Sequence, residues 1–389
     1  MTIALVLADT PAYSETFLNS KIKGLQAHGF KVNLYTRNST NKFNLCEVIQ
    51  APDFSGSYIH KLGEVFRIVI TLFAHLKTVV RFIQLEKQSN RPFTTIIKNL
   101  LINSHILTTK ADWLHFGFAT LAVGSENTAA AIGAKMAVSF RGFDINVYPL
   151  KNPKSYRLVW QRVTKVHSIS VYLWNKATVL GLSPDISKKI ITPAVVTNTL
   201  PDRASGPEPK KIVTIARFNW IKGLDSAIVA LQKLKKAGIE TEYHLVGTGT
   251  KEEEERIRFL VHLFHLETQV IFHGKCTHTQ TLEILSEASV YLQPSLNEGF
   301  CNAVLEAQAM GIPCVVTNGG ALPENIIDGK TGWLVPVYNT DAMAKALQNA
   351  LKLDKNTKEK MKGEAINRVK KQYTIEQQQQ QFVEFYSGL

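Results

Sequence analysis

The chain has 389 residues, of which 45% are hydrophobic and 20% charged, with 23 Gly and 14 Pro. This composition is typical of a folded globular protein, and it excludes a disordered chain, a collagen and a small disulfide scaffold. The length favours two domains. The formal net charge is +13, and its whole excess lies in residues 1–200, which hold 23 Lys and Arg against 10 Asp and Glu, whereas residues 201–389 hold 22 of each. The first half is therefore expected to meet an anionic surface or ligand.

The first half opens with strands that alternate with helices. The apolar run over 3–8 is too short for a signal peptide and predicts a buried strand. A helix over about 15–28 and a strand over 31–36 follow. Further along, the pattern predicts strands over 111–116 and 136–140 with one helix over 121–132 between them.

Residues 60–87 carry an apolar pattern of helical period. At about 100° per residue, Arg67, Lys77 and Arg81 cluster on one arc, and an apolar set falls on the opposite side. A basic amphipathic helix of this kind fits docking on anionic lipid. A helix packed on the core with a solvated basic face is the alternative. The apolar set is Val65, Leu72, Phe73, Leu76, Val79, Val80 and Ile83.

The two halves are separated by residues 192–209, which contain four prolines and Gly206 and are typical of a linker. The second half then repeats short apolar runs and longer helical patterns. This alternation predicts a parallel sheet covered on both faces, which binds ligands at the carboxyl ends of its strands. Strands are expected over 211–216, 242–246, 270–273, 290–293 and 314–317, and helices over 225–237, 251–264, 279–288 and 303–310.

We therefore predict an α/β protein of two doubly wound domains, 1–200 and 201–372, followed by a C-terminal helix over 373–389 that returns to the first domain. The run Gln377 to Gln381 in that helix is interpreted as facing solvent. The four cysteines show neither a C-x-x-C pair nor a histidine at metal-ligand spacing, so free thiols in the cytoplasm are expected. The pattern contains no membrane span of about 20 apolar residues.

The segment E-G-F-C-N-A-V-L-E starts at Glu298 and ends at Glu306. Asn302 is expected to cap a helix, so that the amides of residues 299–303 converge on one point where a phosphate can bind. Carboxylates beside that point accept hydrogen bonds from sugar or ribose hydroxyls. The alternative is a helix start with ordinary acidic neighbours.

Arg217 and Lys222 follow the strand over 211–216, at the end where such a sheet presents ligand groups. Together a guanidinium and an ammonium can hold a diphosphate; the alternative is a pair of ordinary surface cations. Gly247 and Gly249 lack the third glycine of a dinucleotide fingerprint. They are expected instead to let the backbone approach a flat base, with residues 272–275 as the other wall.

These motifs, together with G-I-P-C-V-V, G-G-A-L-P-E and D-G-K-T-G-W-L-V-P between residues 311 and 336, resemble the retaining glycosyltransferases of family four, which have the GT-B fold. The likeness extends to T-P-A-Y-S-E-T-F, A-D-W-L-H-F-G and S-F-R-G-F-D in the first half. It covers nearly the full chain and is least dense between about 40 and 110.

The resemblance implies a nucleotide diphosphate-sugar donor in the second domain and an acceptor in the first. It implies that Arg217 and Lys222 grip the diphosphate and that Glu298 lies by the donor sugar. Glu306 would bind the ribose hydroxyls, and the backbone near Gly247 and Lys275 would meet the base. The amides after Glu298 would meet sugar and phosphate; they belong to Gly299, Phe300, Cys301 and Asn302.

On the acceptor side the candidates are Ser14, Glu15, His115, Arg141 and Asp144. Where the family often has a histidine before Gly142, this chain has Arg141, which is interpreted as meeting a phosphate or acidic sugar or else as forming a structural salt bridge. His115 is a candidate by its strand-end position, with a buried, hydrogen-bonded histidine as the alternative. For Ser14 the alternative is a helix cap.

The resulting prediction is a retaining hexosyltransferase without metal or other cofactor, because no Asp-x-Asp occurs and protein cations can neutralise the diphosphate. Its expected acceptor is a glycan or lipid-linked glycan in polysaccharide or lipopolysaccharide biosynthesis, at the cytoplasmic face of a membrane that residues 60–87 contact. No nucleic acid is expected. Two alternatives stay open: another GT-B enzyme such as a nucleotide-sugar epimerase, and a basic membrane or nucleic-acid binding module whose transferase site has decayed.

Overall fold

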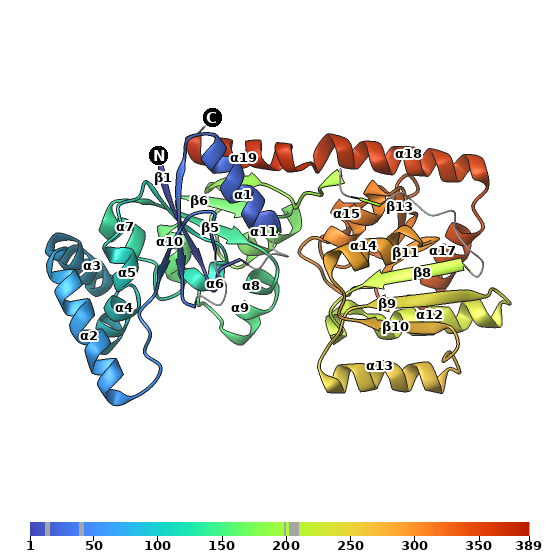
Figure 1. Cartoon of the computed structure of the whole chain (residues 1–389), viewed down its shortest axis with the longest axis horizontal. Coiled ribbons are helices and arrows are strands. Elements are labelled where there is room, and N and C mark those ends of the chain that lie inside the picture. The colour runs from blue at the N-terminus through green and yellow to red at the C-terminus, as the bar shows by residue number, and fades with distance from the viewer. Residues whose placement is uncertain (12–15, 39–42, 198–199, 202–209, 389) are drawn as a thin grey trace. The chain divides into compact units, whose positions relative to one another are not determined.

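The computed structural model describes residues 1–11, 16–38, 43–197, 200–201 and 210–388. The chain divides into two compact units (Figure 1). The first comprises residues 1–191 and 378–389, and the second comprises residues 192–377. The domain boundary, expected after residue 200, falls after Ile191, and the chain rejoins the first unit from Gln378.

The first unit is built on a parallel sheet of seven strands in the order β3-β2-β1-β4-β5-β6-β7. Every pairing between neighbouring strands is parallel, and β1 is buried from Ile3 to Leu7, so it reads as a continuous apolar run. The strands are β1 (Thr2–Leu7), β2 (Lys31–Thr36), β3 (Glu47–Gln50), β4 (Trp113–Phe116), β5 (Lys135–Phe140), β6 (Lys165–Ser168) and β7 (Ser187–Ile190).

Helices surround this sheet, and α2 to α5 and α7 gather on one side of it (Figure 1). The first of the helices is α1 (Thr16–Ala27), whose start agrees with the predicted helix. The others are α2 (Tyr58–Phe73), α3 (Leu76–Gln88), α4 (Phe93–Ile102), α5 (Ser104–Leu107), α6 (Ala119–Ala122), α7 (Thr128–Ile132), α8 (Phe143–Asn146), α9 (Tyr148–Lys151), α10 (Arg157–Arg162) and α11 (Val171–Val179).

Two predicted helices are each broken into two. The helix expected over 60–87 becomes α2 and α3, which bend by 106° at Ala74 and His75. The helix expected over 121–132 becomes α6 and α7, separated by a segment in which Gly124 has φ +84°. This left-handed conformation ends a helix and favours glycine.

The C-terminal helix α19 (Ile375–Ser387) supplies core residues to the first unit. Phe382, Phe385 and Tyr386 pack among the side chains of β1, β2 and α1. The glutamine run is not solvent-facing as expected: Gln378 is buried, and Gln379 donates to the carbonyl and hydroxyl oxygens of Ser20 at 3.1 and 3.0 Å. Gln379 tolerates its partly buried position because its amide nitrogen has two acceptors on Ser20.

The second unit has a parallel sheet of six strands in the order β10-β9-β8-β11-β12-β13. Its expected strands all form, and one more strand, β13, extends the sheet. The strands are β8 (Lys210–Ile215), β9 (Thr241–Val246), β10 (Val270–Gly274), β11 (Val290–Gln293), β12 (Cys314–Thr317) and β13 (Gly332–Val335).

Apolar clusters lie on both faces of this sheet, as a doubly wound fold requires. One cluster contains α12 (Leu224–Lys236), α13 (Lys251–Leu263) and α17 (Thr340–Leu351). The other contains α14 (His278–Ser286) and α15 (Asn302–Ala309). The unit also has α16 (Leu322–Asn325), α18 (Lys355–Gln372) and a 3-10 turn at Trp220–Lys222. Within the described residues, no single helix is both long and apolar enough to span a membrane.

Candidate active site

The centre of the second sheet carries the predicted donor site. Strands β8 and β11 are neighbours there, and the strand order reverses between them. At such a switch point the connections leave toward opposite faces, which opens a crevice at the carboxyl ends of the two strands. Arg217 and Lys222 follow β8, and Glu298 follows β11, so the chain direction brings all three to this crevice.

Lys222 and Glu298 form an ion pair, with Lys222 Nζ 2.6 Å from Glu298 Oε1. The same oxygen accepts hydrogen bonds from Ser295 Oγ at 2.8 Å and Gln293 Nε2 at 3.2 Å. Gln293 is held in turn by the hydroxyl of Tyr291 at 2.5 Å. Three donors on one carboxylate oxygen fix the position of Glu298 before any ligand arrives.

The loop that carries Lys222 is pressed against the loop that carries Glu298. Leu296 N donates to Ile221 O at 2.8 Å. Gly223 has φ +63°, and a Cβ added there would lie 2.1 Å from Pro294 O. Only glycine satisfies both the left-handed conformation and this contact between backbones. The ion pair therefore rests on a rigid junction of two loops.

Arg217 precedes Lys222 in the loop after β8 and has an exposed side chain. Its neighbour Phe218 donates its backbone N–H to Thr248 O at 2.8 Å, and a Cβ on Gly247 would lie 2.0 Å from Ala216 O. Gly247 N also donates to Gly274 O at 2.9 Å. The glycine loop after β9 and the loop after β10, which continues to Lys275, thus lie beside the cationic loop, as the expected base wall requires.

The start of α15 differs from the prediction in one respect. Asn302 is the first helical residue and Cys301 occupies the capping position, where no side chain caps the helix. The backbone N–H of Cys301 donates to Asn325 Oδ1 at 3.1 Å, and Gly299 and Phe300 are buried. The amide of Cys301 is therefore already bonded, and among residues 299–302 only Asn302 is exposed. The predicted cap by Asn302 is therefore wrong, and Asn325 instead holds the residue that precedes the helix.

Glu306 pairs with His278, the first residue of α14, through Oε1 and Nε2 at 3.0 Å. The hydrogen bond that His278 donates to Glu306 raises the pKa of His278, and the negative charge of Glu306 acts in the same direction. Desolvation of the imidazole opposes both effects. Both helices belong to the same face of the sheet. His278 is thus hydrogen-bonded to the Glu306 carboxylate, the group that the resemblance assigns to binding the ribose.

Sequence reasoning missed Gln293, Ser295, His278 and Asn325. Gln293 and Ser295 carried a usable signal, because a polar residue that ends a buried strand lies at the carboxyl edge of the sheet. His278 and Asn325 carried none, since only the folding of the chain brings them to Glu306 and Cys301.

In the first unit, His115 is the buried, hydrogen-bonded histidine that the sequence left as an alternative. Its Nε2 lies 2.8 Å from Ser139 Oγ, and its Nδ1 contacts the hydroxyl of Tyr386 and lies 3.4 Å from Lys21 Nζ. Burial lowers the pKa of both His115 and Lys21. This network joins β4 to β5, α1 and α19, and it does not open to an acceptor.

Asp144 is also buried, and its carboxylate accepts the backbone N–H groups of Arg141, Gly142 and Ala119. It is a structural residue that holds the loop after β5. The Arg141 guanidinium stacks on Phe17, 4.2 Å from the ring centre, and its Nε donates to Gly117 O at 3.2 Å. Ser14 and Glu15 lie outside the described residues.

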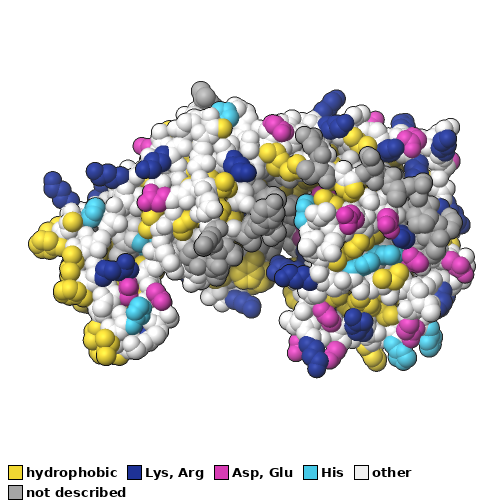
Figure 2. Space-filling view, viewed as in Figure 1, with side chains coloured by type: hydrophobic (Ala, Val, Ile, Leu, Met, Phe, Trp, Pro, Cys, Tyr) yellow, Lys and Arg dark blue, Asp and Glu magenta, His cyan; other side chains and the backbone are white. Residues whose placement is uncertain are grey.

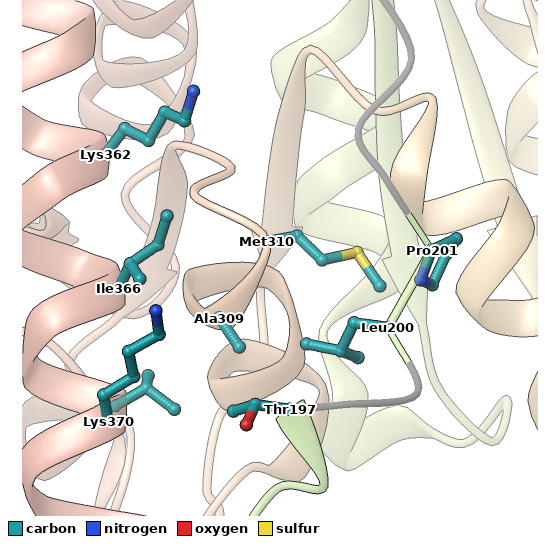
Figure 3. Close-up of a pocket in the computed structure, with 9 residues that line it drawn as sticks. Thr197, Leu200, Pro201, Ala309, Met310, Lys362, Ile366 and Lys370 are labelled. Carbon is teal, nitrogen blue, oxygen red and sulfur yellow. The ribbon is translucent and has the colours of Figure 1, made fainter.

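The four cysteines are free thiols, as expected. In the described part of the chain, no three His, Cys, Asp or Glu side chains are grouped so that they could hold a metal ion. A cavity of about 430 Å³ lies in the second unit, between Met310 and the α18 residues Lys362 and Ile366 (Figure 3). It borders the C-terminal end of α15, whereas Glu298 and Asn302 lie at the opposite end, so this cavity is separate from the candidate site.

The two doubly wound units with parallel sheets form the GT-B fold. Solved structures agree on the fold. Sucrose-phosphate synthase from Thermosynechococcus elongatus has a TM-score of 0.72 at 18% identity, covering 100% of this chain and 98% of that one. HepE from Anabaena, solved with UDP and glucose, has a TM-score of 0.70 at 14% identity over 100% of both chains.

Residues 197–368 match the family described as Glycosyl transferases group 1, which confirms the resemblance. Among curated relatives, WcaL of Escherichia coli strain K12, assigned to colanic acid biosynthesis, is 26% identical over 379 residues, or 91% of each chain. WcaL of Salmonella typhimurium is 29% identical over 256 residues, which span 63% of this chain and 62% of that protein. The second unit of the chain is therefore similar in sequence to glycosyltransferases of this group, and the full chain shares its fold with solved GT-B structures.

Proposed function

We propose that the protein transfers a sugar, with retention of configuration and without a metal ion, from a nucleotide diphosphate-sugar to an acceptor in cell-surface polysaccharide biosynthesis. The observation that carries this proposal is the contact between Lys222 and Glu298 at the switch point of the second sheet. A cation and a preorganised carboxylate stand there within one hydrogen bond of each other. Relatives named for polysaccharide biosynthesis and a neighbour solved with UDP and glucose support the same reading.

The chemistry follows from what these groups can stabilise. The bond between the anomeric carbon and the diphosphate oxygen breaks, and the departing diphosphate gains negative charge that Arg217 and Lys222 neutralise. The acceptor oxygen attacks the same face of the sugar, and its proton passes to the departing phosphate oxygen. Glu298, held by Ser295 and Gln293, accepts hydrogen bonds from the sugar hydroxyls. Glu306 binds the ribose.

The acceptor is assigned to the first unit. A cavity of about 770 Å³ opens there at the carboxyl ends of β2 and β3, where Arg37 and Gln50 line it together with Lys98 of α4. Arg91 also lines it but is paired with Glu126 at 2.7 Å and with Glu86 at 3.5 Å. Arg37 and Lys98 are exposed, so a phosphate or acidic sugar on the acceptor would be neutralised at this position.

The proposal is tested first by thermal unfolding with UDP-, GDP- and ADP-sugars, since a donor at 100 times its dissociation constant stabilises the fold by about 2.7 kcal/mol. Transfer is then measured with the stabilising donor and an added acceptor, in EDTA and with Mn²⁺. We expect full turnover in EDTA and the same anomeric configuration in donor and product. Loss of turnover in EDTA that Mn²⁺ restores would overturn the assignment of Arg217 and Lys222, and interconversion of the free nucleotide sugar without an acceptor would indicate an epimerase.

A further inference from the structure

Helix α2 presents an apolar face to solvent. Its seven exposed large apolar residues fall within an arc of about 120° at 100° per residue and run from one end of the helix to the other. Figure 2 shows hydrophobic side chains gathered along this edge of the first unit. The residues, named here the α2 stripe, are Tyr58, Ile59, Leu62, Phe66, Val69, Ile70 and Phe73.

The α2 stripe coincides only at Phe73 with the apolar set that the helical pattern predicted. Leu72 of the predicted apolar set is buried against the core, together with Ile68. One face of α2 therefore packs on the core through Ile68 and Leu72. The stripe is a second apolar face, next to this packed face. On a helix whose outer side is solvated, that arc carries polar residues instead. Apolar exposure continues onto α3 at Leu76 and Val80.

The charge around the stripe is positive. Residues 54–100 contain seven Lys and Arg and only two carboxylates, Glu64 and Glu86. Glu86 is fully buried and Glu64 is paired with Arg67 at 2.7 Å. Lysines stay exposed on all three neighbouring helices, at Lys61 on α2, Lys77 and Lys87 on α3, and Lys98 on α4. An apolar face bordered by exposed cations complements a bilayer with anionic headgroups.

We propose that the α2 stripe docks the protein on an anionic membrane surface, with α2 lying in the interface and the lysines of α2 to α4 at the headgroups. The helix lies on the bilayer and does not cross it. The pair α2 and α3 bends by 106°, and Ile68, Leu72 and Phe82 are packed in one cluster with Leu107 and Ala131. Insertion of the pair as a span would strip these side chains from the core.

The docking surface is independent of the proposed transfer reaction, because no residue of the stripe belongs to the donor site. The experiment therefore uses the full chain with neither donor nor acceptor. Binding is measured by cosedimentation with vesicles of phosphatidylcholine alone and of phosphatidylcholine with phosphatidylglycerol, over a range of NaCl concentrations. We expect binding to the anionic vesicles that weakens as salt rises, with release in high salt as for a peripheral protein.

The variant that tests the stripe is Phe66→Glu, and the matched control is Phe259→Glu on α13. The two phenylalanines are 69% and 63% exposed, so neither change disturbs a core. We expect Phe66→Glu to weaken vesicle affinity roughly tenfold or more, since it removes one buried aromatic contact with the acyl region. Phe259→Glu should bind as the unchanged protein does. The double change Lys77→Gln with Lys87→Gln should cost roughly fivefold per cation on anionic vesicles, from about 1 kcal/mol each.

Three results would overturn the proposal. One is the absence of binding to anionic vesicles, and another is equal binding by Phe66→Glu and the unchanged protein. The third is a dimer in light scattering that Phe66→Glu dissociates while vesicle binding is absent, because the stripe would then be an interface between two copies of the chain.

Discussion

Glu298 and Lys222 show how a few contacts prepare a site for a charged ligand. The carboxylate is fixed by Lys222, Ser295 and Gln293, so its orientation costs nothing when a sugar arrives. The ammonium of Lys222 lies beside a negative partner and is available to bridge that carboxylate and a diphosphate. Removing either group should therefore leave the other without its counter-charge.

Lys222→Ala is the most direct test at the residue scale. We expect kcat/KM to fall by about 100- to 1000-fold, the usual cost of deleting one group that stabilises transition-state charge. The thermal shift caused by the donor should vanish as well. Lys233→Ala is the control, because Lys233 forms an exposed ion pair with Asp341 in the same unit. A donor shift that survives in Lys222→Ala would contradict the assignment.

His278 predicts a pH dependence of donor binding. The pKa of His278 is raised by the hydrogen bond with Glu306, so the pair contributes stability in full below the ordinary unfolded pKa of about 6.5, and this is lost as pH rises through the raised value. Under the proposed function, protonated His278 competes with the ribose of the donor for Glu306. Donor affinity should therefore increase as pH rises through that pKa.

Calorimetric titration with the nucleotide sugar between acid and alkaline pH measures this effect. His278→Gln keeps an N–H donor near Glu306 but cannot titrate. This variant should bind the donor with little pH dependence. His262→Gln is the control, since His262 on α13 also pairs with a glutamate, Glu267, and both side chains are exposed. Identical pH profiles for the unchanged protein and His278→Gln would rule out the competition.

At the scale of elements, the two loops at the switch point depend on one close approach. Gly223→Ala would place a methyl group 2.1 Å from Pro294 O and would strain a residue at φ +63°. Gly238→Ala, at φ +70° with nothing within 4 Å, carries the strain without the contact. We expect Gly238→Ala to cost about 1 kcal/mol of unfolding free energy and to leave donor affinity unchanged.

Gly223→Ala should cost more than its control and should weaken donor binding as well, because separation of the two loops moves Lys222 away from Glu298. Chemical denaturation gives the first quantity and donor titration the second. Equal effects of the two substitutions on donor affinity would mean that the loop junction does not position the ion pair.

At the scale of the whole molecule, the last helix, α19, completes the core of the first unit. Phe385 is fully buried among residues of β1, β2 and α1, although about 190 residues of the second unit separate these segments in the chain. Phe385→Ala should lower the unfolding free energy of the first unit by about 3–5 kcal/mol, as for other buried aromatic residues. Phe259→Ala, at an exposed phenylalanine, should stay within about 0.5 kcal/mol. Urea unfolding followed by tryptophan fluorescence checks both, and a small effect of Phe385→Ala would argue that α19 is dispensable.

Much of the second unit could be predicted from the sequence. Its strands are buried on both faces, so each reads as a short apolar run, and each run is separated from the next by a helical pattern. Parallel strands end at one edge of the sheet, and for that reason residues that follow β8 and β11 meet although 76 positions separate Lys222 from Glu298. The doubly wound architecture followed from this order, the GT-B fold was expected from the resemblance, and the contact between Lys222 and Glu298 was shown by the structure.

Tertiary packing alone decided the rest. α2 is apolar over more than half of its circumference, so periodicity gives the angles of two apolar faces and cannot say which one the core covers. His115 is polar in the sequence, and only its partners Ser139 on β5 and Tyr386 on α19 make its burial favourable. The order of strands and helices along the chain determined which strand ends meet at the edge of each sheet. Which of two similarly apolar helix faces is buried depended on the distant segment that packs against the helix.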